Sequence, residues 1–205
     1  MHKLFHPQLS KQVIIGTKSK SRRSLFKSIN LNFQYQTANI DEKNVPNLKN
    51  DKYDALKIAI AKADYLSNRN KGKIIVTFDT TILFNKKTVY KCSTPRCCIK
   101  LLNSFSHKTH YLYTGMVFMA DNKIIKKKLS ETKITFKNNH KSVISKYVKD
   151  NFNQIKSAVG CYNIESTGRM LFHNITNSYF NVLGIDIINF IGTLRKIKWK
   201  GKLVF

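Results

Sequence analysis

Hydrophobic and polar positions alternate in blocks along the first third of the chain. The blocks predict a strand, a loop, a helix and a second strand. Residues 12–16 form a short apolar run that ends in glycine, which is typical of a buried strand. The polar and basic residues 17–23 follow, and the apolar positions within 24–29 then recur at helical spacing. At 31–37, Leu, Phe and Tyr occupy alternate positions, which predicts a half-buried strand.

The middle of the chain continues with a helix and with the most hydrophobic strand of the sequence. Between 52 and 66, apolar residues surround Lys62 at helical spacing, which predicts an amphipathic helix. The run KIIVTF at 73–78 predicts a buried strand that ends at Asp79, and apolar residues resume at 82–84. We therefore expect the Asp79 carboxylate at the carboxyl end of a buried strand.

The rest of the chain adds further strands and helices. Thr94 and Pro95 suit the N-cap and first position of a helix that ends near Phe105. The other expected elements are a turn at 85–87 into a short strand at 88–90, long strands at 108–120 and 123–136, a helix at 141–152, a glycine-broken strand and loop at 160–175, and a mainly helical segment at 181–197. Strands interleaved with helices predict an α/β fold, and the length of 205 residues predicts one domain over 1–205.

The sequence favours a cytoplasmic protein without a membrane span. The longest apolar stretch, 182–194, is interrupted by Gly184, Asp186 and Asn189, whereas a spanning helix needs about 20 mostly apolar residues. The first residues lack the continuous apolar run of a signal peptide. The four cysteines fit neither a secreted disulfide framework nor a paired zinc knuckle, so we expect reduced thiols. They are Cys92, Cys97, Cys98 and Cys161.

Charge is the most unusual property of the composition. The chain has 37 Lys and Arg against 11 Asp and Glu, a formal net charge of +26. A hydrophobic content of 42% excludes a disordered basic tail. The basic residues are spread along the whole chain, which favours a lysine-biased composition on solvated faces over a dedicated polyanion site. Because carboxylates are rare, each one in an apolar setting is informative.

The loop between the first strand and the first helix could bind phosphate. Ser19, Ser21, Arg22 and Arg23 stand where the helix begins. Free backbone N–H groups, hydroxyls and guanidinium groups at a helix N-terminus suit a phosphate. An ordinary N-cap with solvated arginines explains the same residues, and both interpretations stay open. The glycines of a Walker loop are missing.

Five further polar residues could carry chemistry. Asp79 could hold a divalent cation or activate water, because ligands of open α/β sheets bind at the carboxyl ends of strands. The alternative is that Asp79 caps a turn, which the apolar strand before it makes the less favoured interpretation. Lys62 and Lys91 could bind phosphate, but each alone is more often a lysine whose stem lies along an apolar surface. Glu42 and Glu165 alone are weak indications of a site.

Eight segments, taken in order, resemble the Maf family of nucleoside triphosphate pyrophosphatases. They are IIGTKSKSRRSLFKSI at 14–29, NIDE at 39–42, AKA at 61–63, FDTTIL at 78–83, VYK at 89–91, SHKTHYLYTG at 106–115, AVGCYNIESTG at 158–168 and SYFNVLGIDI at 178–187. The resemblance covers about residues 12–195. It implies hydrolysis of a nucleoside triphosphate to the monophosphate and pyrophosphate, in a housecleaning role against unwanted or modified nucleotides. It also implies an elongated mixed sheet flanked by helices, with a nucleotide-binding cleft between two lobes.

The resemblance also assigns roles to residues. It implies that Asp79 is the general base and that Glu42 and Asp79 hold a divalent metal, Mg²⁺ or Mn²⁺. The residues that it implies for phosphate binding are Ser19, Arg22, Arg23, Lys62 and Lys91. Lys20 replaces a frequent Pro of the family, Ser166 a usual Gly, and Asp186 a usual Pro.

Three positions separate the substrate classes of the family, and here they are Ser21, Thr80 and Glu165. Thr80 resembles the class that acts on dTTP and UTP, whereas Glu165 resembles the class that acts on 7-methyl-GTP. Ser21 matches neither class. The preferred base therefore stays open.

Two alternatives stand beside the enzyme. One is a basic RNA-binding module that uses the strand aromatics, which are more typical of core packing. The other is a degenerate homologue that binds nucleotides without cleaving them. We expect a nucleoside triphosphate as the partner, and neither a membrane nor nucleic acid. Members of the family are often dimers, so a homodimer is compatible with the sequence.

Overall fold

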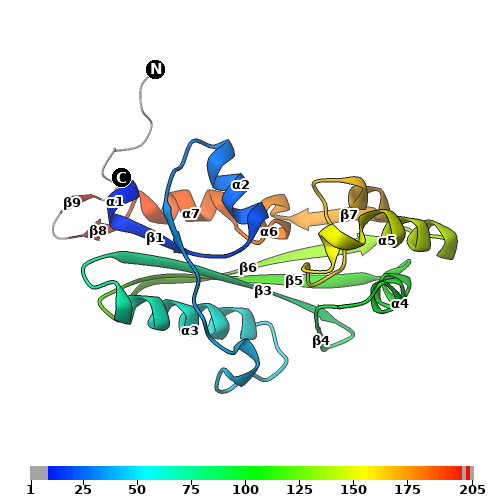
Figure 1. Ribbon diagram of the computed structural model, residues 1–205, viewed down its shortest axis with the longest axis horizontal. Coiled ribbons are helices and arrows are strands. Elements are labelled where there is room, and N and C mark those ends of the chain that lie inside the picture. The colour runs from blue at the N-terminus through cyan, green and yellow to red at the C-terminus, as the bar shows by residue number, and fades with distance from the viewer. Residues whose placement is uncertain (1–8, 200–201, 204–205) are drawn as a thin grey trace.

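A mixed sheet of seven strands forms the centre of the molecule, and helices cover both of its faces (Figure 1). The computed structural model describes residues 9–199 and 202–203. The strand order is β2-β1-β3-β5-β6-β7, with β4 paired to β3. The bounds are Val13–Gly16 (β1), Gln34–Gln36 (β2), Ile74–Phe84 (β3), Lys87–Val89 (β4), Thr109–Ala120 (β5), Lys123–Phe136 (β6) and Phe172–Asn177 (β7). Strands β8 (Lys198–Trp199) and β9 (Lys202–Leu203) form a separate pair.

The helices lie in three groups around the sheet. Their bounds are Leu9–Gln12 (α1), Lys20–Ser28 (α2), Asp54–Arg69 (α3), Pro95–Phe105 (α4), Lys141–Ile155 (α5), Tyr179–Val182 (α6) and Ile187–Leu194 (α7), with 3₁₀ turns at Glu42–Asn44 (η1) and Thr167–Leu171 (η2). Figure 1 shows α3 on one side of the sheet and α2 and α7 on the other, with α4 and α5 at the far end. The predicted α/β class and the elongated, helix-flanked sheet are confirmed.

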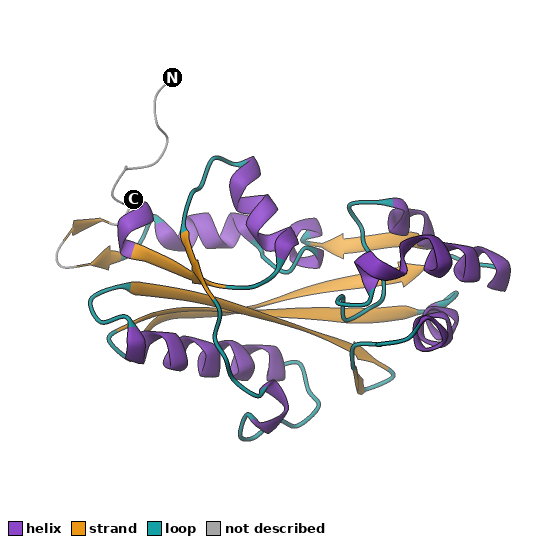
Figure 2. Cartoon of the chain, viewed as in Figure 1, coloured by secondary structure: helices purple, strands orange, loops and turns teal. Residues whose placement is uncertain are grey.

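The long strands connect the two ends of the molecule. Strand β1 pairs in parallel with β2 and β3, whereas β3, β5, β6 and β7 pair antiparallel in that order. Strands β3, β5 and β6 extend along most of the length of the molecule (Figure 2). Two lobes therefore share one sheet.

Each lobe has its own hydrophobic core. In the first lobe, Phe26 of α2 and Phe190 of α7 pack on Phe78 of the sheet. In the second lobe, Phe105 of α4 packs on Phe136 of β6 near α5. All five rings are buried. Burial of such rings is the main driving force for folding, so each core stabilises its own lobe.

Helix α3 packs unusually close to the sheet at Gly115 of β5. A Cβ atom at this position would lie 2.5 Å from the Cα of Leu56 and 2.6 Å from the carbonyl oxygen of Ala55. Only glycine permits this approach. Because Gly115 is the register partner of Asp79, the close contact brings α3 over the part of β3 that carries Asp79.

Strand β3 differs from the prediction of two apolar runs separated by a polar break. It runs without interruption from Ile74 to Phe84, so Asp79 lies within the strand and not at its end. Backbone pairing with β5 continues through this region. Thr80 and Thr81 are β-branched and therefore suit an extended backbone.

The helices also differ in detail from the sequence prediction. Helix α2 begins at Lys20, earlier than expected, because Ser19 caps it. The segment predicted as mainly helical at 181–197 is divided into α6 and α7, and between them Gly184 has a φ of +86° that favours glycine. None of the helices within the described residues is sufficiently long and apolar to span a membrane.

The cysteines correct the expectation of reduced thiols. Cys92 and Cys97 form a disulfide, with their Cα atoms 5.4 Å apart, while Cys98 and Cys161 are free and buried. The predicted N-cap of α4 explains the pairing. Thr94 accepts a hydrogen bond from the backbone of Cys97 at 3.2 Å, and this turn brings Cys97 back toward Cys92.

Candidate active site

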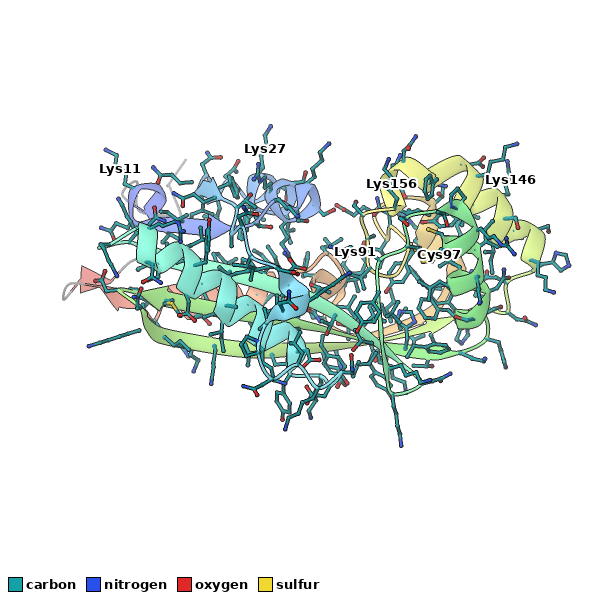
Figure 3. All side chains as sticks on the ribbon, turned by 60° about the horizontal axis from the view of Figure 1, so that its bottom comes forward. Lys11, Lys27, Lys91, Cys97, Lys146 and Lys156 are labelled. Atoms are coloured by element: carbon teal, nitrogen blue, oxygen red, sulfur yellow. A yellow bond between two sulfur atoms is a disulfide. The ribbon has the colours of Figure 1, made fainter. Side chains whose placement is uncertain are left out.

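A cleft of about 890 Å³ lies between the two lobes. Its walls come from α2 and the loop before it, the segment after β2, strand β3, and the end of α5 with the segment that follows it. Lys91, in the connection after β4, also lines the cleft and lies near the middle of the molecule (Figure 3). The cleft contains every site residue predicted from the sequence except Arg23, namely Ser19, Ser21, Arg22, Glu42, Lys62, Asp79, Thr80, Lys91 and Glu165.

A lysine held between two carboxylates forms the centre of the cleft. The Nζ atom of Lys62 lies 2.6 Å from Oδ1 of Asp79 and 2.7 Å from Oε1 of Glu42. Asp79 comes from β3, Lys62 from α3 and Glu42 from η1. Asp79 is only 7% exposed. The ion pair therefore compensates a carboxylate that has lost most of its water, which a buried charge requires.

The environment shifts the pKa values of the two carboxyl groups in opposite directions. Burial raises the pKa of Asp79, and the attraction of Lys62 opposes this effect without cancelling it. Burial also acts to raise the pKa of Glu42, but Lys62, Lys91 and Lys18 outweigh it, so that pKa is lowered. A buried acid with a raised pKa beside a charged partner is typical of groups that accept or donate protons.

Arg22 lies in the cleft with its guanidinium fixed by three hydrogen bonds. It donates to the carbonyl oxygens of Gly184 at 2.9 Å and Phe78 at 3.4 Å, and to Oγ1 of Thr80 at 3.0 Å. These bonds join α2, β3 and the α6–α7 turn. They hold a positive charge close enough to Asp79 to influence its titration. A cation fixed in this way is preorganised for an anionic ligand.

Arg23 is not brought to the cleft. Its guanidinium donates to the carbonyl oxygen of Thr17 at 2.8 Å and lies over the ring of Tyr35, 4.9 Å from the centroid. It therefore fixes the loop before α2 from outside. Ser19 does line the cleft, where its hydroxyl also accepts the N-cap hydrogen bond from the backbone of Arg22 at 3.4 Å.

The three residues expected to separate substrate classes all line the cleft. Thr80 is fixed by Arg22 and by Thr114, whose Oγ1 atom lies 3.0 Å from that of Thr80. Glu165 is exposed, in the segment after α5. Ser21 lies in the first turn of α2.

Among the cleft residues that the sequence analysis did not predict, Lys18 and Gly184 act directly on predicted site residues. Lys18 lines the cleft and contributes to the lowered pKa of Glu42. Lys18 belongs to the same basic loop as Ser19, so its place in that loop could have identified it as a cleft residue. Gly184 contributes its carbonyl oxygen to Arg22. The sequence analysis placed Gly184 in a mainly helical segment, and nothing local indicated the turn or its partner.

The carboxylate oxygens around Lys62 are suitable ligands for a divalent metal. Lys62 pairs with one carboxylate oxygen of Glu42 and one of Asp79. The second oxygen of each carboxylate has no hydrogen bond or ion pair within the described residues. Mg²⁺ usually binds through one or two carboxylates together with substrate phosphates. Glu42 and Asp79 are therefore a chemically suitable pair for Mg²⁺ or Mn²⁺.

Comparison with known proteins gives the same family along nearly the whole chain. The family model described as Maf-like protein matches residues 12–197. A 7-methyl-GTP pyrophosphatase of Brucella suis is 27% identical over 91% of this chain and 96% of its own length. A dTTP/UTP pyrophosphatase of Fusobacterium nucleatum is 27% identical over 94% of this chain and 98% of its own. A nucleoside triphosphate pyrophosphatase of Nitrobacter hamburgensis is 24% identical over 90% of this chain and 93% of its own length. This chain therefore belongs to the Maf-like protein family.

Proposed function

We propose that this protein hydrolyses a nucleoside triphosphate to the nucleoside monophosphate and pyrophosphate. The observation that carries the proposal is the buried Asp79 carboxylate, paired with Lys62 in a cleft that also contains Arg22 and Lys91. Relatives that align over 90–94% of the chain are named 7-methyl-GTP pyrophosphatase, dTTP/UTP pyrophosphatase and nucleoside triphosphate pyrophosphatase. A cleft with one buried acid and several cations suits a triphosphate that is attacked by water.

In the proposed reaction, Asp79 accepts a proton from the attacking water. The water oxygen forms a bond to the α-phosphorus, the bond from that phosphorus to the bridging oxygen breaks, and pyrophosphate leaves with the electron pair. Lys62 keeps Asp79 oriented and favours its ionised form. Positive charge from Arg22, Lys91 and Lys18 opposes the negative charge that collects on the departing oxygens.

The metal in this proposal is Mg²⁺ or Mn²⁺, held by Glu42 and Asp79. When bound, a divalent cation polarises phosphoryl oxygens and neutralises charge on the triphosphate. Lys62 then positions both carboxylates through their other oxygens. The lowered pKa of Glu42 keeps that carboxylate ionised at neutral pH, which metal binding requires.

The geometry does not favour the RNA-binding alternative. The aromatic residues of β5 that could stack on bases are Tyr111, Tyr113 and Phe118; Tyr113 and Phe118 are buried, and Tyr111 is 38% exposed. Recognition of single-stranded RNA by a sheet needs several exposed rings that stack on successive bases. The cations Arg22, Lys62 and Lys91 instead share one cleft with Asp79.

Release of pyrophosphate from a panel of nucleotides tests the proposal. The panel contains dTTP, UTP, 7-methyl-GTP, GTP and ATP, each with Mg²⁺ or Mn²⁺ and each with excess chelator. We expect monophosphate and pyrophosphate in equal amounts, and no turnover with chelator. Folded protein that binds these nucleotides without cleaving any of them would establish the degenerate homologue instead.

A further inference from the structure

Three cysteine sulfurs meet in the second lobe, away from the carboxylates of the cleft. The Sγ atoms of Cys92, Cys98 and Cys161 all lie within 4.8 Å of one another. Cys92 precedes α4, Cys98 lies in the first turns of α4, and Cys161 follows α5. Within the described residues, this is the only group of three or more Cys, His, Asp or Glu side chains that could hold one ion together.

The three cysteines are more deeply buried than ordinary surface thiols. Cys92 is 4% exposed, and Cys98 and Cys161 are fully buried. They belong to the second hydrophobic core, next to Leu102 and Tyr147. In tetrahedral zinc sites the metal–sulfur distance is about 2.3 Å, which places two sulfur ligands about 3.8 Å apart. The observed spacing therefore needs only small side-chain adjustments to reach this geometry.

We propose that the reduced protein binds one zinc ion through Cys92, Cys98 and Cys161. Thiolate sulfur is a preferred ligand for zinc, and three protein ligands leave one position open. The three thiols each lose a proton to solvent when the ion binds. This site is separate from the carboxylate pair of the proposed pyrophosphatase reaction and does not depend on it.

The disulfide between Cys92 and Cys97 competes with the ion. In the disulfide form, Cys92 has no thiolate to offer. A dithiol reductant opens the bond by transferring two electrons and two protons, which yields the thiols of Cys92 and Cys97 and a new disulfide in the reductant. Cys97 is exposed and is not one of the three grouped sulfurs, so it is accessible to such a reductant.

Zinc at this position would connect two segments that line the cleft. Lys91 directly precedes Cys92, and Tyr162 directly follows Cys161 in the segment that leads to Glu165. Tyr162 also hydrogen bonds His110 of β5, with Oη 2.9 Å from Nε2. The ion would therefore fix the wall of the cleft that the second lobe contributes.

The test is zinc stoichiometry in the full chain without a histidine tag. The protein is reduced with a phosphine, which consumes one water per disulfide and leaves no competing thiol. It is then incubated with Zn²⁺, passed through a desalting column with a weak chelator, and analysed for metal. We expect one zinc per chain after reduction and far less before it. A reduced, folded protein that retains no zinc would overturn the proposal, and this result requires no variant.

Single substitutions identify the ligands. Cys161→Ser and Cys98→Ser should each lose the bound zinc, whereas Cys97→Ser should bind it without any reductant because the Cys92–Cys97 disulfide cannot form. Retention of a full equivalent by Cys161→Ser would also overturn the assignment. Because Cys98 and Cys161 are fully buried, Cys161→Ala and circular dichroism of each variant distinguish loss of a ligand from loss of folding.

Cobalt substitution adds a direct view of the ligands. Co²⁺ bound by thiolates gives sulfur-to-metal charge-transfer absorption, and its intensity falls as thiolate ligands are removed. We expect this absorption in the reduced wild-type protein and in Cys97→Ser at equal strength. Cobalt spectra without a thiolate band would contradict the proposed ligands even if some metal is retained.

Discussion

The ammonium group of Lys62 donates a hydrogen bond to the buried carboxylate of Asp79, with Nζ 2.6 Å from Oδ1. Helix α3 and strand β3 bring the two groups together, and Gly115 of the neighbouring strand β5 permits the close packing of α3 on the sheet. Removal of one partner from such a pair leaves the other charge buried and uncompensated, which typically costs ~3–5 kcal/mol. Lys62 therefore serves both the fold and the proposed reaction.

Replacement of Asp79 by Asn tests its proposed role as the general base. The amide keeps the size of the side chain but cannot accept the proton of the attacking water. We expect kcat for pyrophosphate release to fall by ~10²–10³, the usual effect of removing one such group, with little change in nucleotide affinity. Stopped assays and equilibrium binding of a nonhydrolysable analogue measure the two quantities.

Asp150→Asn is the matched control for this variant. Asp150 lies on α5, pairs with Lys146 at 3.2 Å on the surface, and does not line the cleft. We expect Asp150→Asn to retain wild-type turnover. Near wild-type turnover of Asp79→Asn would refute the proposed base.

Replacement of Lys62 by Met should change the pH dependence of activity. Burial already raises the pKa of Asp79, and Lys62 opposes that rise. Without the ammonium group, the Asp79 pKa rises further, so Asp79 stays protonated to a higher pH. The acid limb of the kcat/KM profile should then move to higher pH. In Lys62→Arg, which keeps a positive charge, the acid limb should lie close to its wild-type position. An acid limb that stays in place in Lys62→Met would exclude Asp79 as the titrating group.

Sequence periodicity was sufficient for the elements but not for their contacts. The long strands β5 and β6 and helix α4 lie where their patterns predicted them. Helix α4 buries one face, at Cys98, Leu102 and Phe105, whereas β5 is buried on both faces over most of its length. The continuation of β3 through Asp79 was missed, because a buried strand can contain a carboxylate only when a cation such as Lys62 compensates its charge. That partner comes from tertiary packing, for which a single sequence has no local signal.

The arginines show a related limit. Arg22 and Arg23 are adjacent on α2, so their side chains leave the helix axis about 100° apart. One therefore reaches the cleft while the other lies over Tyr35. Helical periodicity could have separated them, had the start of α2 been placed at Lys20. The turn capped by Thr94 was predicted, but nothing in the sequence indicated that this turn brings Cys97 to Cys92.

Substitution of the two arginines by Lys should therefore have unequal effects. Lysine at position 22 cannot reach Gly184, Phe78 and Thr80 together, and each lost hydrogen bond to a charged group costs ~1.5–3 kcal/mol. We expect kcat/KM to fall by at least ~10-fold for Arg22→Lys and by only a few-fold for Arg23→Lys. Steady-state kinetics of both variants provide the comparison. Equal losses would mean that Arg23 reaches the substrate.

Replacement of Gly115 by Ala should destabilise the fold. The added methyl group would lie 2.5 Å from the Cα of Leu56, and the backbone of α3 would have to move away from the sheet. Such overpacking typically costs ~1–3 kcal/mol in the free energy of unfolding. Gly192→Ala is the control, because a Cβ there meets nothing within 4 Å and alanine favours a helix. Urea denaturation should give a lower midpoint for Gly115→Ala but not for Gly192→Ala. Equal midpoints for the two variants would show that α3 can move away from the sheet without loss of stability.

Replacement of Glu165 by Gln should alter the choice of base. The methylated ring of 7-methyl-GTP carries a positive charge, and Glu165 offers an exposed carboxylate at the cleft wall that forms no ion pair within the described residues. Exposed charge pairs contribute ~0.2–1 kcal/mol, so kcat/KM for 7-methyl-GTP should fall by up to about fivefold. The values for UTP and GTP should not change, since their bases are neutral. Competition assays with mixed substrates measure the ratio directly, and a parallel loss for all three nucleotides would show that Glu165 contributes to the cleft without reading the base.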